Sequence, residues 1–219
     1  MDSRTDRLIL VTMVLTVLEV SLAGLVLRRP WAFSFIAWQM VLTYLVYTGL
    51  TRNRLLVRLL VLPLFADLVQ LLTDWYHARV VETLVYDYAL FRIWETPDYI
   101  IAGWGFAFLQ LGYLTLWLKR RIGLWPAIGL VTVVGSILHT WYEEMAYQAH
   151  AWRYINASLL AHVSHWVILT FVALIASLCV IVAWLEKRPV RDWALGGLLV
   201  GALIFVYSAI AVALFRYVG

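Results

Sequence analysis

The run NASLLAHVSHWVILTFVALIASLCVIVAWL at residues 156–185 contains no Asp, Glu, Lys or Arg. A helix that crosses a bilayer needs about 20 mostly apolar residues, and this run exceeds that length. In water, a run of this kind would have to be buried along its whole length inside a small domain. It therefore predicts a membrane-spanning helix over Asn156–Leu185.

The composition of the whole chain agrees with a membrane protein. Of its 219 residues, 64% are hydrophobic and 14% are charged, whereas soluble domains are roughly 45–50% apolar. A soluble fold of this size exposes too much of its chain to hide that much apolar surface. With Pro 5, Gly 12 and Cys 1, the chain also fits neither a disordered, nor a collagen-like, nor a disulfide-rich class.

Seven segments are long and apolar enough to span a bilayer. They are Leu8–Leu27, Trp31–Leu50, Leu55–Thr73, Asp98–Leu118, Ile122–His139, Asn156–Leu185 and Trp193–Val218. No stretch between them resembles a separate soluble domain. The predicted fold is an all-α, polytopic transmembrane helical bundle of about seven spans, with residues 1–219 forming a single transmembrane domain.

The basic residues predict the orientation of this bundle. The N-terminus and the loops near 52–58, 119–121 and 187–191 carry more Lys and Arg than the loops on the opposite side. By the positive-inside rule, the N-terminus is expected in the cytoplasm. We expect a multi-pass protein of the bacterial inner membrane, whose partners are the lipid bilayer and a hydrophobic small molecule, and not nucleic acid.

Two non-cytoplasmic connections resemble each other. Residues 74–97 and 140–155 both open near a Trp-Tyr pair followed by an ionisable residue, at Trp75-Tyr76-His77 and at Trp141-Tyr142-Glu143. Each also contains a further Trp close to its end. Trp and Tyr collect at membrane interfaces in any case. The similarity is either such an aromatic belt or a weak parallel repeat of spans three and four in spans five and six.

Ionisable side chains inside spans are costly, so each one is a candidate functional group. The third span carries a series at spacings of three, four and three: Asp67, Gln70, Asp74 and His77. Such spacings place the series on one helical face, which must turn away from lipid. Comparable series occur in and after the fifth span and in the sixth, namely His139, Glu143 and Tyr147, and Ser158, His162 and His165.

The rise of 1.5 Å per helical residue gives the depth of these groups. One layer, roughly 9–15 Å below the non-cytoplasmic surface, is predicted to hold Glu19, Gln39, Asp67, His162 and His165. The rim above it is predicted to hold Asp74, His77, Asp98, His139, Glu143 and Asn156. No Lys or Arg is expected in the deep layer, so its carboxyl groups are protonated, bonded to His or bound to a cation.

These groups suggest an intramembrane enzyme that modifies a lipidic substrate by acid–base chemistry, because a carboxyl group in a dry site can serve as general acid. We expect Asp67 or Glu19 to donate the proton and His162 and His165 to relay it. The full set of catalytic candidates is Asp67, Glu19, His162, His165, Asp74, His77 and Glu143. Candidate substrate contacts are Gln39, Gln70, Trp75, Tyr76, Tyr99, Trp104, Gln110, His139, Tyr142 and Asn156.

Other interpretations remain open. The same polar groups could serve a small transporter or proton-coupled carrier, or could hold the helices of a non-catalytic subunit together. No cofactor is predicted, but a divalent metal at the His/Asp layer would make the protein a metal-dependent intramembrane hydrolase, and facing histidines could bind haem. A retinal protein is excluded, because the only lysines, Lys119 and Lys187, lie at predicted span ends. The substrate and the oligomeric state stay open.

Three runs carry a family likeness: ETLVYDY (82–88), WETPDYIIAGWGFAFLQLGY (94–113) and HTWYEEMAYQAHAWRY (139–154). They resemble a group of small bacterial multi-span proteins. Across residues 67–166 the chain is also distantly similar to integral-membrane carotenoid hydratases and to seven-helix membrane terpene cyclases. The resemblance implies an isoprenoid or carotenoid substrate. The Gly-Val-Pro element of the carotenoid family is replaced by Thr96-Pro97-Asp98 and Asn156-Ala157-Ser158, so no catalytic residue carries over.

Overall fold

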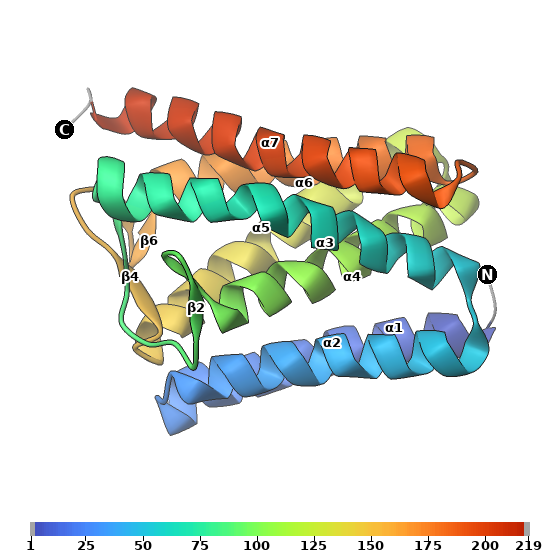
Figure 1. Cartoon of the computed structure of the whole chain (residues 1–219), viewed down its shortest axis with the longest axis horizontal. Coiled ribbons are helices and arrows are strands. Elements are labelled where there is room, and N and C mark those ends of the chain that lie inside the picture. Colours follow the sequence, from blue (N-terminus) through green and yellow to red (C-terminus); the bar gives the residue numbers. More distant parts are fainter. Residues whose placement is uncertain (1–2, 217–219) are drawn as a thin grey trace.

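The computed structural model describes residues 3–216 and consists mainly of long helices that run along one axis (Figure 1). These helices are α1 (Ser3–Ser21), α2 (Trp31–Thr51), α3 (Arg54–Trp75), α4 (Asp98–Ile122), α5 (Leu124–Gln148), α6 (His165–Leu185) and α7 (Val190–Arg216). Within the described residues, seven helical segments are long and apolar enough to cross a membrane. The prediction of an all-α, multi-pass bundle is confirmed, and the cytoplasmic N-terminus stays a prediction.

The helix ends follow local chain chemistry. Asn53 caps α3, because its side-chain oxygen accepts hydrogen bonds from the N–H groups of Leu55 (3.0 Å) and Leu56 (3.3 Å). The first N–H groups of a helix have no acceptor within the helix itself, so a cap of this kind supplies one. Gly123 separates α4 from α5 with a φ of 89°, a conformation that a side chain would strain. Two short π-helical segments, η1 (Leu22–Leu27) and η2 (Tyr76–Val80), extend α1 and α3.

Several predicted span boundaries need correction. The sixth helix begins at His165 and not at Asn156, because residues 159–164 form a hairpin of β5 (Leu159–Leu160) and β6 (Val163–Ser164). Asn156 and Ala161 have positive φ angles of 49° and 53°, which end any helix there. The fifth helix continues to Gln148, so half of the predicted second connection is helical. Val218, the predicted end of the last span, lies outside the described residues.

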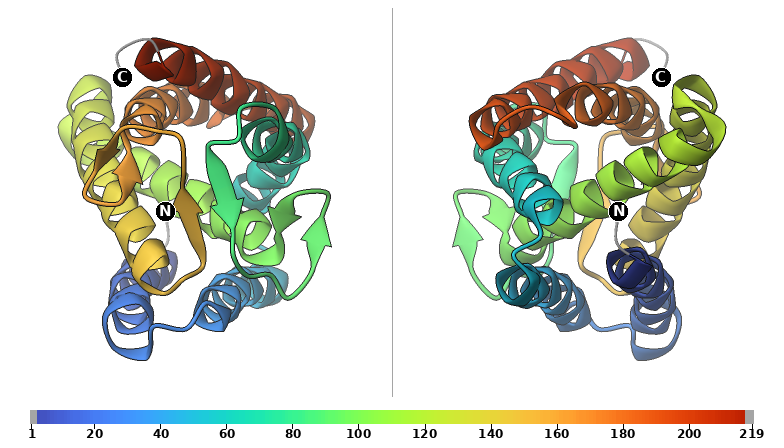
Figure 2. Two further views of the ribbon diagram at one scale, coloured as in Figure 1. Left: turned by 90° about the vertical axis from the view of Figure 1, so that its left-hand side faces the viewer. Right: turned by 90° about the vertical axis from the view of Figure 1, so that its right-hand side faces the viewer.

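The two connections meet over one end of the bundle. Strand β1 (Leu84–Tyr86) pairs antiparallel with β4 (Trp152–Tyr154), so that Tyr86 lies opposite Trp152. A second small hairpin joins β2 (Arg92–Ile93) to β3 (Thr96–Pro97). Figure 2 shows these strands lying across the helix ends. We call this layer, residues 81–97 and 149–164, the cap.

Helix α4 is the centre of the bundle, where it contacts α1, α2, α3, α5 and α6 (Figure 2). Helix α7 packs along α3 on one side, whereas α1 and α2 lie together on another (Figure 1). The α3–α7 contact depends on Gly201, where a Cβ atom would lie 2.6 Å from the carbonyl oxygen of Ala66. Small residues allow this close approach between spanning helices. The helices thus hold the cap residues in fixed positions above the bundle core.

Candidate functional site

Asp74, near the end of α3, is a buried carboxylate that the cap supplies with hydrogen-bond donors. Its Oδ1 accepts from Nε2 of Gln70 and from the hydroxyl of Tyr86, both at 2.9 Å, and its Oδ2 accepts from Oγ1 of Thr96 at 2.7 Å. Burial and the neighbouring Asp74 carboxylate raise the pKa of Tyr86 well above its usual value. The phenol therefore keeps its proton and donates to Asp74.

Glu143, on α5, is held by the other strand of the cap. Its Oε2 accepts from Nε1 of Trp152 and from the hydroxyl of Tyr154, both at 2.6 Å. Burial, and then the charge on Glu143, raises the pKa of Tyr154 well above its usual value, so this phenol also stays a donor. Within the described part of the chain, Oε1 of Glu143 has only a 3.7 Å contact with Nε2 of His139, which is longer than a hydrogen bond.

The two carboxylates are built on the same plan. Each lies near the end of a helix and is bonded to a tyrosine from the strand that follows, 12 residues later for Asp74 and 11 residues later for Glu143. These strands, β1 and β4, pair with each other. The resemblance between the two connections therefore extends from their sequence to their structure.

A small cavity lies between these two carboxylates, and we call it the polar chamber. Its volume is about 60 Å³. The residues of its lining that carry acidic, hydroxyl or nitrogen-bearing side chains come from α3, η2, the cap, α4, α5, α6 and α7. These residues are Gln70, Thr73, Asp74, His77, Tyr86, Trp104, Glu143, Trp152, Tyr154, Trp166, Thr170 and Ser208. The chamber therefore brings many polar groups of the capped end around one small space.

A larger cavity of about 550 Å³ lies between α1, α4 and α5, and we call it the apolar cavity. Leu10, Val14 and Leu18 of α1 line it and are between 41% and 59% exposed, so the cavity reaches the face of the bundle that meets lipid. Four residues line both the apolar cavity and the polar chamber: Ile100, Trp104, Glu143 and Trp152. Glu143 is the one carboxylate in this shared wall.

His77 also lines the polar chamber. Its ring stacks on that of Trp166 with a centroid distance of 4.0 Å and an interplanar angle of 3°. Its Nδ1 lies 3.0 Å from Oγ1 of Thr83 in the cap. Among residues 3–216, the buried Nε2 atom of His77 has no hydrogen-bond partner. The ring is thus fixed on one edge and free to bind a further group on the other.

Comparison with known proteins gives a family for the chain. A family model described as a domain of unknown function (DUF6989) matches residues 71–215, which is more than half of the chain. The chain belongs to the DUF6989 family. The match begins inside α3 and ends inside α7, so it takes in Asp74, Glu143 and the whole cap. No curated protein and no solved structure matches the chain.

In this DUF6989 protein, many of the sequence-predicted residues come together at the capped end. The polar chamber contains the predicted rim residues Asp74, His77 and Glu143, together with Gln70. The apolar cavity contains further predicted substrate contacts, namely Tyr99, Trp104, His139 and Tyr142, and also Gln110 from the middle of α4. His139 stacks with Trp104 and also contacts the ring of Phe171.

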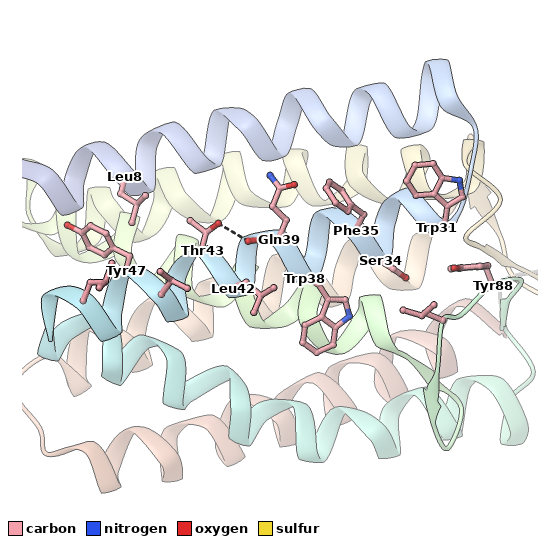
Figure 3. A pocket seen from close by; sticks show the side chains of 13 residues that line it. Leu8, Trp31, Ser34, Phe35, Trp38, Gln39, Leu42, Thr43, Tyr47 and Tyr88 are labelled. Carbon is pink, nitrogen blue, oxygen red and sulfur yellow. Dashed lines mark hydrogen bonds between the residues drawn. The ribbon is translucent and has the colours of Figure 1, made fainter.

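The deeper predicted layer does not gather into one cluster. Glu19 accepts a 3.0 Å hydrogen bond from Gln39 between α1 and α2, and Gln39 lines a separate groove of about 1000 Å³ along α2 (Figure 3). Asp67 is buried on α3, and among residues 3–216 its Oδ1 has no hydrogen-bond partner. Neither Glu19 nor Asp67 lines the polar chamber.

Of the two histidines of the predicted sixth span, His162 lies in the cap and His165 is the first residue of α6. His162 is in the turn between β5 and β6, where its Nδ1 lies 2.8 Å from Oε1 of Glu144 and its ring stacks on Tyr147. His165 begins α6, and its Nδ1 lies 3.1 Å from the Ser158 hydroxyl. The expectation that both histidines sit deep in the bundle is wrong, because the hairpin replaces the start of the predicted helix.

The remaining candidates have peripheral contacts. Trp75 is 45% exposed, as expected for an interfacial anchor. Tyr76 packs edge-on against His77, and Asn156 donates a 3.1 Å hydrogen bond to the carbonyl of Glu82. Across residues 3–216, no three His, Cys, Asp or Glu side chains come together as a metal site would require.

Of the five donors that hold the two carboxylates, only Gln70 was among the predicted site residues. The other four are Tyr86, Thr96, Trp152 and Tyr154. A sequence signal for two of them exists, since a Tyr follows each carboxylate at nearly the same interval. That signal gains meaning only when β1 and β4 are known to pair, because the pairing turns both strands over the helix ends.

Proposed function

We propose that this protein is an intramembrane enzyme that modifies a lipidic substrate, of isoprenoid or carotenoid type, by acid–base chemistry. Hydration, cyclisation and isomerisation all belong to this class, because each begins when a carbon–carbon double bond takes up a proton. The observation that carries the proposal is the position of Glu143, which borders the apolar cavity on one side and the polar chamber on the other.

The contacts of Glu143 suit a proton donor. Neutral donors hold Oε2 in place, whereas Oε1 has only the long contact with His139. In the described structure neither Glu143 nor Asp74 is bonded to a Lys or Arg, so no cation fixes either group in its ionised form. A positioned carboxyl group that can carry a proton is what general acid catalysis requires. We therefore assign the proton donor to Glu143 in place of Asp67 or Glu19.

The proposed step is balanced within the site. Oε1 of Glu143 gives its proton to one alkene carbon, the π electrons form the new C–H bond, and a cation remains on the neighbouring carbon. The rings of Trp104, Tyr142 and Trp152 line the cavity beside Glu143, and ring faces attract cations. Loss of a different proton to the Glu143 carboxylate completes an isomerisation and restores the acid.

The apolar cavity supports a hydrocarbon substrate. Its volume of about 550 Å³ lies within the range of ~300–1,000 Å³ found for small-molecule sites. Its wall is largely aliphatic and aromatic, and it reaches the lipid-facing side of α1. An isoprenoid dissolved in the bilayer could thus enter from the side without crossing the cap.

The test is turnover in lipid nanodiscs prepared in D₂O, with geranylgeraniol and β-carotene as separate probes and mass spectrometry as the readout. Wild-type protein is expected to incorporate deuterium on carbon, and Glu143→Gln is expected to lose this activity at least about 100-fold, as for removal of a general acid. Glu144→Gln is the matched control, because Glu144 bonds His162 outside the chamber. Full activity of Glu143→Gln overturns the assignment, and movement of a probe across the bilayer without chemical change favours a carrier.

A further inference from the structure

We propose that the polar chamber is a water-binding site, and that its water connects Glu143 with the aqueous face of the cap. The site stands on the geometry of the chamber alone, whereas its role as a proton source for Glu143 rests on the proposed function. The volume of about 60 Å³ exceeds the roughly 10–15 Å³ that one water molecule requires, so the chamber has room for more than one.

Unsatisfied polar atoms collect around this chamber. Within residues 3–216, four buried atoms of its lining have no protein partner, namely Oε1 of Gln70, Oγ1 of Thr73, Nε2 of His77 and Nε1 of Trp166. A buried polar atom without a partner is costly and uncommon. Four of them around one small cavity indicate a shared ligand that can bond to several of them at once.

The chemistry of these atoms selects water over an ion. Nε2 of Gln70 donates to the Asp74 carboxylate, so Oε1 of the same amide is left as an acceptor. Nε1 of Trp166 carries a hydrogen and can only donate. A metal cation would be repelled by the indole N–H, and an anion by the amide oxygen and the two carboxylates. Water both donates and accepts, and it matches the mixed set.

A pocket in the cap gives this water a route to the outside. The pocket has a volume of about 360 Å³ and is lined in part by Asn156, Ser158 and Thr83. Trp166 lines both this pocket and the chamber, and Thr83 bonds His77. Irregular strands and turns of this kind are not stable in contact with lipid, so the cap end faces water. Thr83, His77 and Trp166 thus separate the aqueous pocket from the chamber, with Glu143 on the inner side.

The site can be tested by X-ray hydroxyl-radical footprinting of the full chain in nanodiscs, read out by mass spectrometry. Radicals formed from bound water label the side chains next to it. Tyr86 lines the chamber and is 9% exposed. Tyr44 is fully buried, does not line the chamber, and forms hydrogen bonds with other side chains. We expect Tyr86 to be labelled several-fold faster than Tyr44. Equal, slow labelling of both tyrosines would overturn the proposal.

Filling the chamber provides the second arm of the test. Thr170 lines the chamber and bonds only its own helix, so Thr170→Leu should displace water and lower Tyr86 labelling several-fold. Thr140→Leu is the matched control, since Thr140 makes the same kind of bond on α5 outside the chamber lining. Ser208→Val fills the chamber from α7 if Thr170→Leu does not fold. Unchanged Tyr86 labelling in a folded filling variant contradicts the water site.

The outcome is separable from that of the enzyme proposal. Footprinting uses no substrate, so rapid Tyr86 labelling together with an inactive wild-type protein would support the water site and reject the proposed function. Slow Tyr86 labelling in an active enzyme would reject the water site and leave Glu143 as the acid. If both proposals hold, Thr170→Leu should also reduce turnover several-fold while Thr140→Leu does not.

Discussion

Asp74 and Glu143 at the capped end of the bundle and Glu186 at the other end are bonded to different kinds of donor. At the capped end, Asp74 and Glu143 are bonded to neutral phenol, indole, hydroxyl and amide donors. At the other end, Glu186 follows α6 and is bonded to Nζ of Lys119 at 2.9 Å and to Nη2 of Arg120 at 2.7 Å. Glu186 is therefore neutralised by cations, whereas neutral donors alone bond Asp74 and Glu143 in the described structure.

This difference affects the charge that each carboxyl group carries. Burial alone would raise the pKa of Glu186, but the hydrogen bonds from Arg120 and Lys119 lower it below its usual value, so the carboxylate stays ionised and anchored. Neutral donors position a carboxyl group without requiring a particular charge on it. The donors of Asp74 and Glu143 are thus compatible with proton exchange, whereas the cations beside Glu186 favour its ionised form.

The largest expected effect is that of Asp74→Ala. It removes the acceptor of three hydrogen bonds and leaves the donors of Gln70, Tyr86 and Thr96 unpaired. Because each unpaired buried donor costs about 1–3 kcal/mol, we expect the free energy of unfolding in detergent to fall by roughly 3–5 kcal/mol. Asp74→Asn keeps an oxygen acceptor and should lose less. A loss for Asp74→Ala no larger than that for Glu186→Ala would break the comparison of the two ends.

Spacing within single helices predicted much of the capped end. The intervals between Gln70, Asp74 and His77 placed them on one face, and all three line the polar chamber. Apolar length also predicted the number of spans correctly. Such periodicity works because it depends only on the geometry of one helix.

Contacts between distant segments could not be read in the same way. Tyr86 reaches its position because β1 pairs with β4, which lies 66 or more residues further along the chain. Residues 156–164 contain no charged side chain, so their composition does not distinguish a hairpin from the start of a helix. His162 and His165 were therefore assigned to the wrong depth, while the donors that the cap supplies to Asp74 and Glu143 were missed.

A smaller effect is expected when one neutral donor is removed. Thr96→Val keeps the shape of the side chain but loses the 2.7 Å hydrogen bond to Oδ2 of Asp74. Hydrogen bonds to charged groups contribute about 1.5–3 kcal/mol. Because Asp74 keeps its other two donors, we expect the free energy of unfolding to fall by an amount near the lower limit of this range. Thr140→Val, which removes only a bond to its own helix, is the control and should change stability far less. Equal losses would mean that Thr96 does not stabilise Asp74.

The smallest effect should come from Glu186→Gln, and its dependence on solution conditions distinguishes it from the other two. The ion pairs with Lys119 and Arg120 are partly exposed, and pairs of this kind contribute about 0–1 kcal/mol. Because its pKa is lowered in the folded protein, Glu186 stabilises the fold above its unperturbed pKa of 4.5, and this contribution is lost as the pH falls further.

Melting temperatures in detergent can check both dependences. The difference between wild type and Glu186→Gln should be greatest at neutral pH and low salt, and should shrink in high salt because solvent ions screen exposed charges. The loss of stability caused by Thr96→Val should not respond to salt, since Thr96 and Asp74 are both buried and the Thr96 hydroxyl is uncharged. A salt-insensitive Glu186→Gln difference would show that the two ends are not stabilised by different kinds of contact.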